Sequence, residues 1–104
     1  METKKMPPIH PGEILLEEFL KPLKISQTRL ARGIGVPYRR VNEIVQSKRS
    51  ITPDTALRFS VYFKTTPEFW MNLQIQYELR VLKQKLNKRY EKINPYSEHL
   101  ERFL

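Results

Sequence analysis

The sequence contains no cysteine, and it offers little else for disulfide or metal chemistry. Without a thiol, neither a disulfide framework nor a thiolate metal site can form, and this absence fits a reducing cytoplasm. The two histidines, His10 and His99, lie far apart, and neither has a partner at metal-ligand spacing. The sequence has no apolar run of about 18 residues and no secretory leader with a small-residue cleavage site. We therefore expect a cytoplasmic protein with no metal site and no membrane span.

The sequence motifs of common enzymes are also missing. Only three glycines occur, and none of them belongs to a phosphate-cradling loop. There is no nucleophile elbow, and no pair of carboxylates has a reason for a shifted pKa. We therefore predict that the protein is not an enzyme and has neither catalytic residues nor a cofactor.

Positive charge is what the sequence does have. Its 104 residues, about the size of one small domain, include 19 lysines and arginines against 11 acidic residues, which gives a formal net charge of +8. The excess is concentrated in residues 25–50, which carry six basic residues and one acidic residue. This charge predicts a polyanionic partner: nucleic acid first, an anionic membrane surface second and an acidic protein third.

Eight prolines and several capping residues divide the chain into a series of helices. Proline is favoured in the first turn of a helix, and Ser26 and Thr52 can accept a hydrogen bond from an otherwise unpaired early N–H group. The Thr-Pro-acid pattern at Thr52 recurs at Thr66, whereas Pro22 is expected to end the first helix. The pattern predicts an all-α protein without strands, with five helices over residues 11–20, 26–33, 37–46, 52–65 and 67–94.

Residues 27–46, QTRLARGIGVPYRRVNEIVQ, have the spacing that a helix-turn-helix requires. Ala31 is small where the two helices would cross closely, and Gly35 follows where a tight turn needs a positive φ. Val41 and Ile44 are apolar where the second helix would pack back on the first. Because the outer face is basic, we predict DNA binding. The alternative is an ordinary helical hairpin with a solvated basic face.

In a helix-turn-helix, the start of the second helix meets base edges in the major groove. Arginine can bind guanine O6 and N7, asparagine can pair with adenine, and tyrosine can contact a thymine methyl group or a phosphate. The candidate base contacts are Tyr38, Arg39, Arg40 and Asn42. The candidate phosphate contacts are Gln27, Gln46, Lys48 and Arg49. The sequence leaves open which arginine reads a base, and for Lys48 and Arg49 an exposed basic loop is the alternative.

The fifth predicted helix is apolar on two sides, so it needs two partners. One side can close the core of the monomer and carries Phe69, Trp70, Leu73, Tyr77 and Val81. The other side can form a two-fold dimer interface, and its residues are Ile75, Leu79, Leu82 and Leu86. The alternative is that both sides pack within one chain.

Basic residues gather near the end of the same helix. They are Arg80, Lys83, Lys85, Lys88, Arg89 and Lys92. Such a run is more often a solvated helix face than a second phosphate-binding surface, and we favour the solvated face.

Several longer motifs are more specific than a generic helix-turn-helix. They are His10-Pro11-Gly12-Glu13, Arg40-Val41-Asn42-Glu43-Ile44, Thr52 to Leu57 and Pro67-Glu68-Phe69-Trp70-Met71-Asn72-Leu73. With these motifs, residues 9–80 resemble the HigA-type antitoxins, which are VapI-like members of the XRE group with a lambda-repressor-like fold. The resemblance implies a five-helix lambda-repressor-like helix-turn-helix domain with a long C-terminal helix.

The resemblance also implies a function. It indicates a homodimer that binds double-stranded operator DNA, represses its own operon and neutralises a HigB-type toxin, a small ribosome-dependent mRNA endonuclease. Two alternatives stay open: a free-standing regulator without a toxin, and a toxin inhibitor that acts mainly by binding protein. The chain is expected to comprise an extension over 1–10, the DNA-binding domain over 11–66, a helix over 67–94 that completes the core and the dimer interface, and a tail over 95–104.

Overall fold

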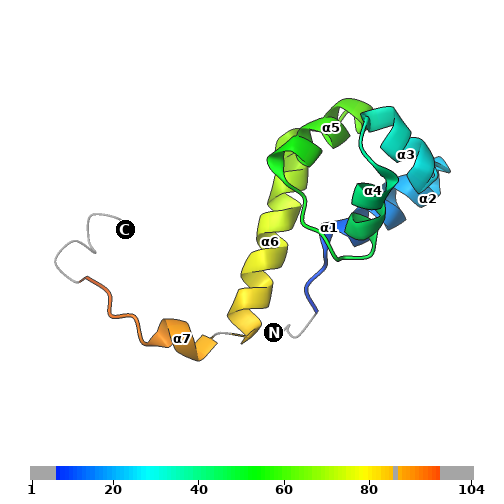
Figure 1. Ribbon diagram of the computed structural model, residues 1–104. Coiled ribbons are helices and arrows are strands. Elements are labelled where there is room, and N and C mark those ends of the chain that lie inside the picture. The colour runs from blue at the N-terminus through cyan, green and yellow to red at the C-terminus, as the bar shows by residue number, and fades with distance from the viewer. Residues whose placement is uncertain (1–6, 86, 97–104) are drawn as a thin grey trace.

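The computed structural model describes residues 7–85 and 87–96, and the regular elements in this part of the chain are all helices. Figure 1 shows their order along the chain. The elements are α1 (Pro11–Ile14), η1 (Leu15–Leu20), α2 (Lys21–Leu23), α3 (Gln27–Ile34), α4 (Tyr38–Val45), α5 (Pro53–Phe63), α6 (Pro67–Lys85) and α7 (Asn87–Glu91). The predicted all-α fold is confirmed, and none of the described helices is long and apolar enough to cross a membrane.

Three helices begin at the predicted capping residues Ser26, Thr52 and Thr66, and α1 begins at His10. In each case a side-chain acceptor takes a backbone N–H that the helix itself leaves unpaired. The pairs are Ser26 Oγ with the N–H of Arg29 (3.0 Å), Thr52 Oγ1 with that of Thr55 (3.4 Å), Thr66 Oγ1 with that of Phe69 (3.1 Å) and His10 Nδ1 with that of Gly12 (2.9 Å). Local sequence therefore fixes where these helices start.

The first helix is longer than expected, because it continues through Pro22 to Leu23. The element η1 is a π-helix, and at its end the N–H of Lys21 bonds to the carbonyl of Leu16, five residues back. A proline ring normally clashes with the carbonyl four residues before it, and the wider π turn relieves that contact. The chain leaves the helix at Lys24, which adopts a left-handed conformation with φ 56°. The prediction that Pro22 ends the helix was wrong.

Trp70 of α6 fills the centre of the core. It is fully buried, its ring centroid lies 4.9 Å from that of Phe19 and 5.0 Å from that of Phe59, and its Nε1 donates to Thr65 Oγ1 at 2.8 Å. A buried tryptophan normally finds such an acceptor for its N–H. The other buried apolar residues are Leu15, Leu20, Leu30, Ala31, Ile34, Val41, Ile44, Ile51, Ala56 and Phe59.

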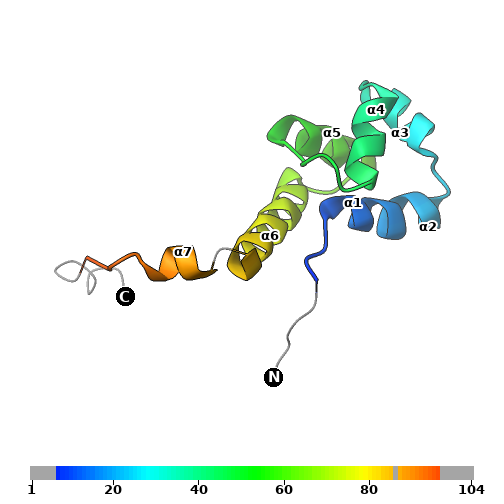
Figure 2. The same cartoon turned by 60° about the horizontal axis from the view of Figure 1, so that its bottom comes forward.

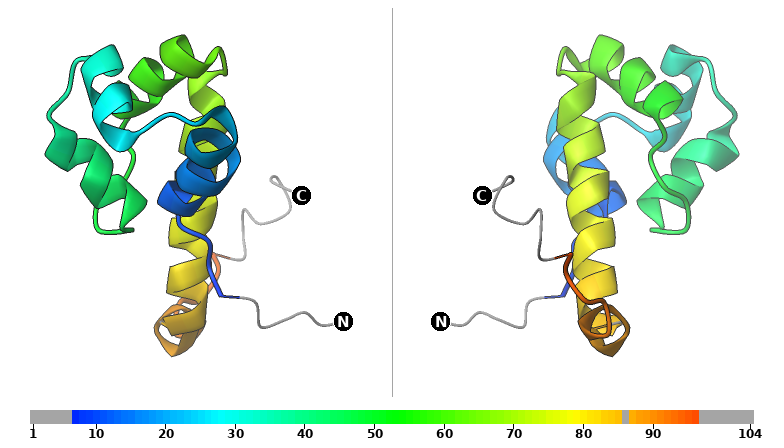
Figure 3. Two further views of the ribbon diagram at one scale, coloured as in Figure 1. Left: turned by 90° about the vertical axis from the view of Figure 1, so that its right-hand side faces the viewer. Right: turned by 90° about the vertical axis from the view of Figure 1, so that its left-hand side faces the viewer.

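One close contact holds α4 against α1, and a hydrogen bond holds the loop after α4 against α6. A side chain at Gly12 would collide with the backbone carbonyl of Ile44, so α1 and the end of α4 approach at a distance that only glycine allows. Gln74 of α6 is buried, and its Oε1 accepts a hydrogen bond from the N–H of Ile51 at 2.8 Å. Helix α4 itself lies at the outer edge of the molecule, away from α6 and α7 (Figure 3).

The predicted helix over residues 67–94 is shorter in the structure. Helix α6 ends at Lys85, and α7 runs in a different direction, away from the body (Figures 1 and 2). Residues 83–92 contain five basic residues and few apolar ones, so like charges crowd the helix while little apolar surface holds it on the core. The prediction that this helix reaches residue 94 was wrong.

Candidate nucleic-acid interface

Helices α3 and α4 form the predicted helix-turn-helix. Ala31, Val41 and Ile44 are all buried where the two helices pack together. Gly35 ends α3 with φ 75°, and its N–H and that of Val36 both bond to the carbonyl of Ala31 at 3.0 Å. This paired capping by a left-handed glycine makes the tight turn between the helices. The roles predicted for Ala31, Gly35, Val41 and Ile44 are confirmed.

The outer face of α4 is opposite these buried residues and carries polar side chains. Tyr38 is half exposed, and the side chain of Arg39 is 83% exposed. Because successive helical residues are turned by about 100°, Arg39, Asn42, Glu43 and Gln46 lie on the side opposite the core. The start of α4 therefore presents an aromatic, a cationic and an amide group to the outside.

Four of the predicted contact residues are joined by hydrogen bonds. Asn42 Nδ2 donates to Gln27 Oε1 at 2.9 Å and to Tyr38 Oη at 3.3 Å, and Gln46 Nε2 donates to Asn42 Oδ1 at 2.9 Å. We call Gln27, Tyr38, Asn42 and Gln46 the amide network. Both amide hydrogens of Asn42 bond within the protein, so a contact from Asn42 to a base requires the exchange of one of these bonds.

A second set of contacts centres on Glu43. Its Oε2 accepts from Arg39 Nε at 2.8 Å, and its Oε1 accepts from Arg49 Nε at 2.8 Å. Arg49 Nη2 also lies 2.7 Å from this Oε1 as an ion-pair contact. Hydrogen bonds from Arg39 first and Arg49 second hold the pKa of Glu43 below its usual value. No role was predicted for Glu43 from the sequence. Glu43 is nevertheless the one acidic residue in the basic stretch 25–50, and it lies four residues after Arg39.

Arg40 has different surroundings from Arg39. Its Nη1 donates to Asp54 Oδ2 at 3.0 Å, and the same oxygen accepts from Arg58 Nε at 2.9 Å. Arg58 Nη1 also donates to the carbonyl of Ile34 at 2.7 Å. These bonds join α4, the first turn of α5 and the end of α3, and the hydrogen bond from Arg58 is the main cause of the lowered pKa of Asp54. That Arg40 contacts a base stays a prediction.

The loop after α4 places the two remaining candidates at its surface. Ser47 has φ 63°, and the N–H of Lys48 bonds to the carbonyl of Glu43 at 2.8 Å. Lys48 and Arg49 are both exposed. Arg49 is held by Glu43, whereas no ion pair engages Lys48 among the residues that the structure describes. The loop therefore extends the basic surface beyond the end of α4.

His10 connects this loop to the body of the protein. The residue is buried, and its ring meets that of Tyr77 edge to face, with centroids 4.8 Å apart. Burial lowers the pKa of His10, and a hydrogen bond to the backbone of Arg49 opposes that shift. In the described part of the chain, no three His, Asp or Glu side chains are placed to hold a metal ion.

Helix α6 buries one of its two apolar sides. Trp70 is buried, Leu73, Tyr77 and Val81 are half buried, and Phe69 at the edge is exposed. On the other side the exposed fractions are 47% for Ile75, 44% for Leu79 and 40% for Leu82, and Leu86 lies outside the described residues. A single chain thus leaves this stripe uncovered, and its use as a dimer interface stays a prediction.

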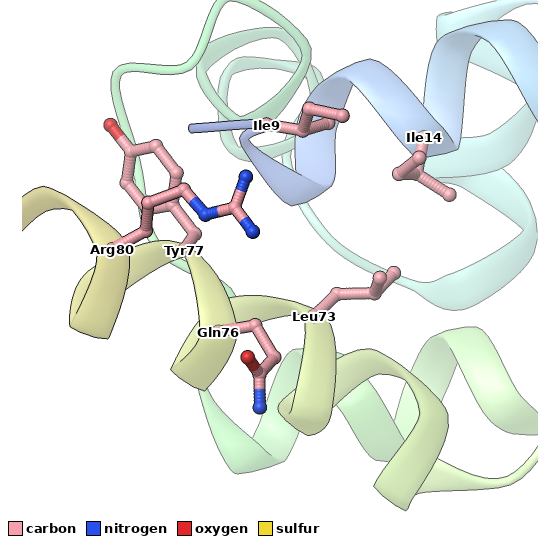
Figure 4. A pocket seen from close by; sticks show the side chains of 6 residues that line it. All are labelled: Ile9, Ile14, Leu73, Gln76, Tyr77 and Arg80. Atoms are coloured by element: carbon pink, nitrogen blue, oxygen red, sulfur yellow. The ribbon is translucent and has the colours of Figure 1, made fainter. Parts of the chain in front are cut away.

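A hollow of about 180 Å³ lies beside this stripe, between the segment that precedes α1 and helix α6 (Figure 4). Its lining residues are Ile9, Ile14, Leu73, Gln76, Tyr77 and Arg80. Gln76 and Arg80 also line a second hollow, together with Leu79 of the stripe. The two hollows therefore form one continuous surface along α6.

Comparison with known proteins identifies the family. The helix-turn-helix family model matches residues 16–70 of the chain. Virulence-associated protein I of Dichelobacter nodosus is 49% identical over 80 residues, which are 77% of this chain and 74% of that protein. The structure of Pseudomonas aeruginosa antitoxin HigA with the higBA promoter is 44% identical, with 86% of this chain and 98% of that chain covered and a TM-score of 0.82.

A further solved structure is similar over nearly the same share of the chain. It is an addiction module antidote protein of the HigA family from Coxiella burnetii, which is 47% identical, with 88% of this chain and 100% of that chain covered and a TM-score of 0.82. The chain therefore belongs to the helix-turn-helix family of HigA-type antitoxins, whose members are DNA-binding regulators and not enzymes.

Proposed function

We propose that the protein is a sequence-specific repressor that places α4 in the major groove of its operator. The observation that carries this proposal is the two-sided construction of α4. Val41 and Ile44 fix one side in the core, while Tyr38, Arg39 and Asn42 lie away from it. Gln27 of α3 and Gln46 bond to this outer surface through Asn42. A helix held in this way presents base-reading groups in a fixed register. The Pseudomonas aeruginosa relative was solved with promoter DNA, which supports the same use of the fold.

The geometry supports a division of labour among the candidate residues. Arg39, with Tyr38 and Asn42 beside it, is placed to meet base edges. Arg40 lies at the border of this surface, where its pairing with Asp54 favours a supporting role. We assign backbone contacts to Gln27, Gln46, Lys48 and Arg49, which lie around the rim.

A fluorescence anisotropy titration tests this function. Its two DNA probes are the chain's own upstream DNA and a scrambled duplex, each at several salt concentrations, with wild type and an Arg39→Ala/Arg40→Ala variant. We expect wild type to prefer its own promoter by at least about a thousandfold, the low end of specific binding. The preference should disappear in the variant. Equal, purely salt-driven binding to both duplexes would contradict the proposal, since it indicates backbone contacts alone.

We further propose that the functional unit is a homodimer formed through the exposed stripe of α6. The stripe is apolar, and the hollow next to it can receive side chains of a second copy. A two-fold dimer would present two α4 helices to the two halves of a palindromic operator. Sedimentation equilibrium of the full chain tests this point, and a monomer at micromolar concentration contradicts it.

The toxin partner is the third part of the proposal. Two relatives of the chain are described as an antitoxin and as an addiction module antidote. We infer that this chain likewise binds and neutralises a HigB-type mRNA endonuclease in the cytoplasm. Co-expression with the neighbouring short reading frame tests this inference. Rescue of growth together with co-purification supports it, whereas a lone gene with no such neighbour favours the free-standing regulator.

A further inference from the structure

Glu43 is an unusual residue to find on a surface that faces DNA. Its carboxylate lies on the outer side of α4, its side chain is only 24% exposed, and it engages Arg39 and Arg49 at once. A negative charge there opposes the approach of phosphates. The pairs that Glu43 forms with Arg39 and Arg49 lie at the surface, where an ion pair contributes little to folding stability. Stability alone therefore does not account for a carboxylate at this position.

The atoms that Glu43 engages leave part of each arginine available. Arg39 gives its Nε to the carboxylate, and no other side chain in the described part of the chain pairs with its two terminal Nη groups. Arg49 donates from its Nε to one oxygen of Glu43, and its Nη2 lies 2.7 Å from the same oxygen. A guanidinium held at Nε presents its two Nη groups end-on, in the fork that matches O6 and N7 of guanine.

We propose that Glu43 is a positioning residue that sets the base preference of the operator complex, because it aims the Nη groups of Arg39 at one guanine in each half-site. Arg49, held on the other oxygen of the same carboxylate, is kept at the rim to bind the adjacent phosphate. The carboxylate therefore lowers affinity for DNA in general and raises discrimination among sequences. This inference rests on the proposed function of the same surface.

Glu43→Gln is the variant that tests the inference, because the amide keeps the shape of the side chain but cannot hold two cations. Binding to scrambled DNA should strengthen about two- to fivefold, the effect of one exposed charge interaction. Preference for the chain's own promoter should fall at least about fivefold, the low end of the effect of one mismatched base pair. Glu18→Gln in η1 is the matched control. It removes the same charge outside α4 and should change neither quantity.

A second measurement identifies the base. Each guanine of the promoter is replaced in turn by 7-deazaguanine, which lacks the N7 acceptor. For wild type, replacement at one position in each half-site should reduce affinity about fivefold or more. Arg39→Ala should be insensitive to the replacement at that position, and Glu43→Gln should show a smaller reduction there. A variant that merely misfolds would instead weaken binding to every duplex and lower Tm.

The outcomes separate this inference from the function on which it rests. If wild type prefers its promoter and Glu43→Gln keeps both the preference and the 7-deazaguanine profile, the role of Glu43 is refuted and the repressor stands. The same holds if Glu43→Gln weakens binding to scrambled DNA instead of strengthening it. If wild type shows no preference for its promoter, the proposed function and the role of Glu43 fail together.

Discussion

Arg39 and Arg40 are neighbours in the sequence, yet their guanidinium groups lie in different environments. The side chain of Arg39 is 83% exposed beside Glu43, whereas that of Arg40 is 30% exposed and pairs with Asp54 at the start of α5. Adjacent residues on a helix are turned by about 100°, so one can face outward while the other meets a neighbouring helix. Single substitutions should therefore separate DNA recognition from folding.

We expect Arg40→Ala to affect folding and Arg39→Ala to affect recognition. Loss of Arg40 breaks the link between α4 and α5 and should lower Tm by up to about 4 °C, the effect of one partly exposed ion pair. Arg39→Ala should leave Tm unchanged and reduce the preference for promoter DNA. Differential scanning calorimetry and anisotropy measure the two effects. Equal Tm values for both variants would contradict the structural role of Arg40.

Gln74 is a buried polar residue with a specific structural task. Gln74→Ala leaves the buried N–H of Ile51 without its acceptor, which should cost about 1–3 kcal/mol in the free energy of unfolding. The exposed Gln76 on the same helix is the matched control, and Gln76→Ala should cost less than about 0.5 kcal/mol. Urea denaturation measures both variants. A similar cost for the two would show that the bond to Ile51 contributes nothing.

Because His10 is buried, we predict that the folding stability of the protein depends on pH. Burial lowers its pKa in the folded protein below the ordinary value of 6.5, so the unfolded chain binds a proton more readily. The contribution of His10 to the free energy of unfolding is therefore complete above about pH 6.5. It decreases as the pH falls from there toward the pKa of His10 in the folded protein. Glu43 and Asp54, whose pKa values are lowered from 4.5 and 3.8, respond only at more acidic pH.

The variant His10→Asn isolates this effect, because asparagine can still cap α1 but does not titrate. Between about pH 7.5 and pH 5.5, the free energy of unfolding of wild type should fall more steeply than that of His10→Asn. Urea denaturation at a series of pH values gives the comparison. Parallel curves would refute the assignment to His10.

At the scale of elements, the sequence predicts the starts of helices better than their ends. Ser26 and Thr52 cap their helices through contacts three residues away, and such local chemistry can be read directly from a sequence. The continuation through Pro22 depends on tertiary packing instead. Leu15 and Leu20 are both buried, and a π turn brings residues five apart closer to one side of the helix. No local signal reports that requirement.

Within the candidate site, too, some features can be predicted from the sequence and others depend on tertiary packing. Gly35, Val41 and Ile44 are recognisable because their spacing follows from helix geometry. The pairing of Arg40 with Asp54 joins residues 14 apart in the sequence, and it depends on how α5 packs against α4. Sequence reasoning could therefore find the surface of α4, but it could not assign a separate task to each charged residue.

The uncovered stripe of α6 gives a prediction about assembly. Leu79→Lys places a charge in the middle of the stripe, so the proposed dimer should dissociate and affinity for a two-site operator should fall at least about tenfold. Val61→Lys is the matched control, because Val61 is 80% exposed on α5 and lies outside the stripe. Sedimentation equilibrium and anisotropy report the two properties. A dimeric Leu79→Lys variant would contradict this interface.

At the scale of the whole molecule, positive charge is distributed over separate surfaces. Lys48 lies beside α4, whereas Lys83 lies near the far end of α6. We expect Lys48→Ala to reduce the slope of log affinity against log salt by about 0.9, the contribution of one neutralised phosphate. Lys83→Ala should leave the slope unchanged if the basic end of α6 is a solvated face. Anisotropy titrations across a salt series test both variants.

Gly12 carries a consequence for the evolution of this molecule. Any side chain at that position would occupy the space of the Ile44 carbonyl, so the angle between α1 and α4 depends on a hydrogen atom at position 12. Natural variation can change the side chains on the outer face of α4 without disturbing this contact. It cannot change residue 12 without moving α4 itself. Homologues that keep the same docking angle should therefore be invariant at this glycine while they diverge at Tyr38 and Arg39.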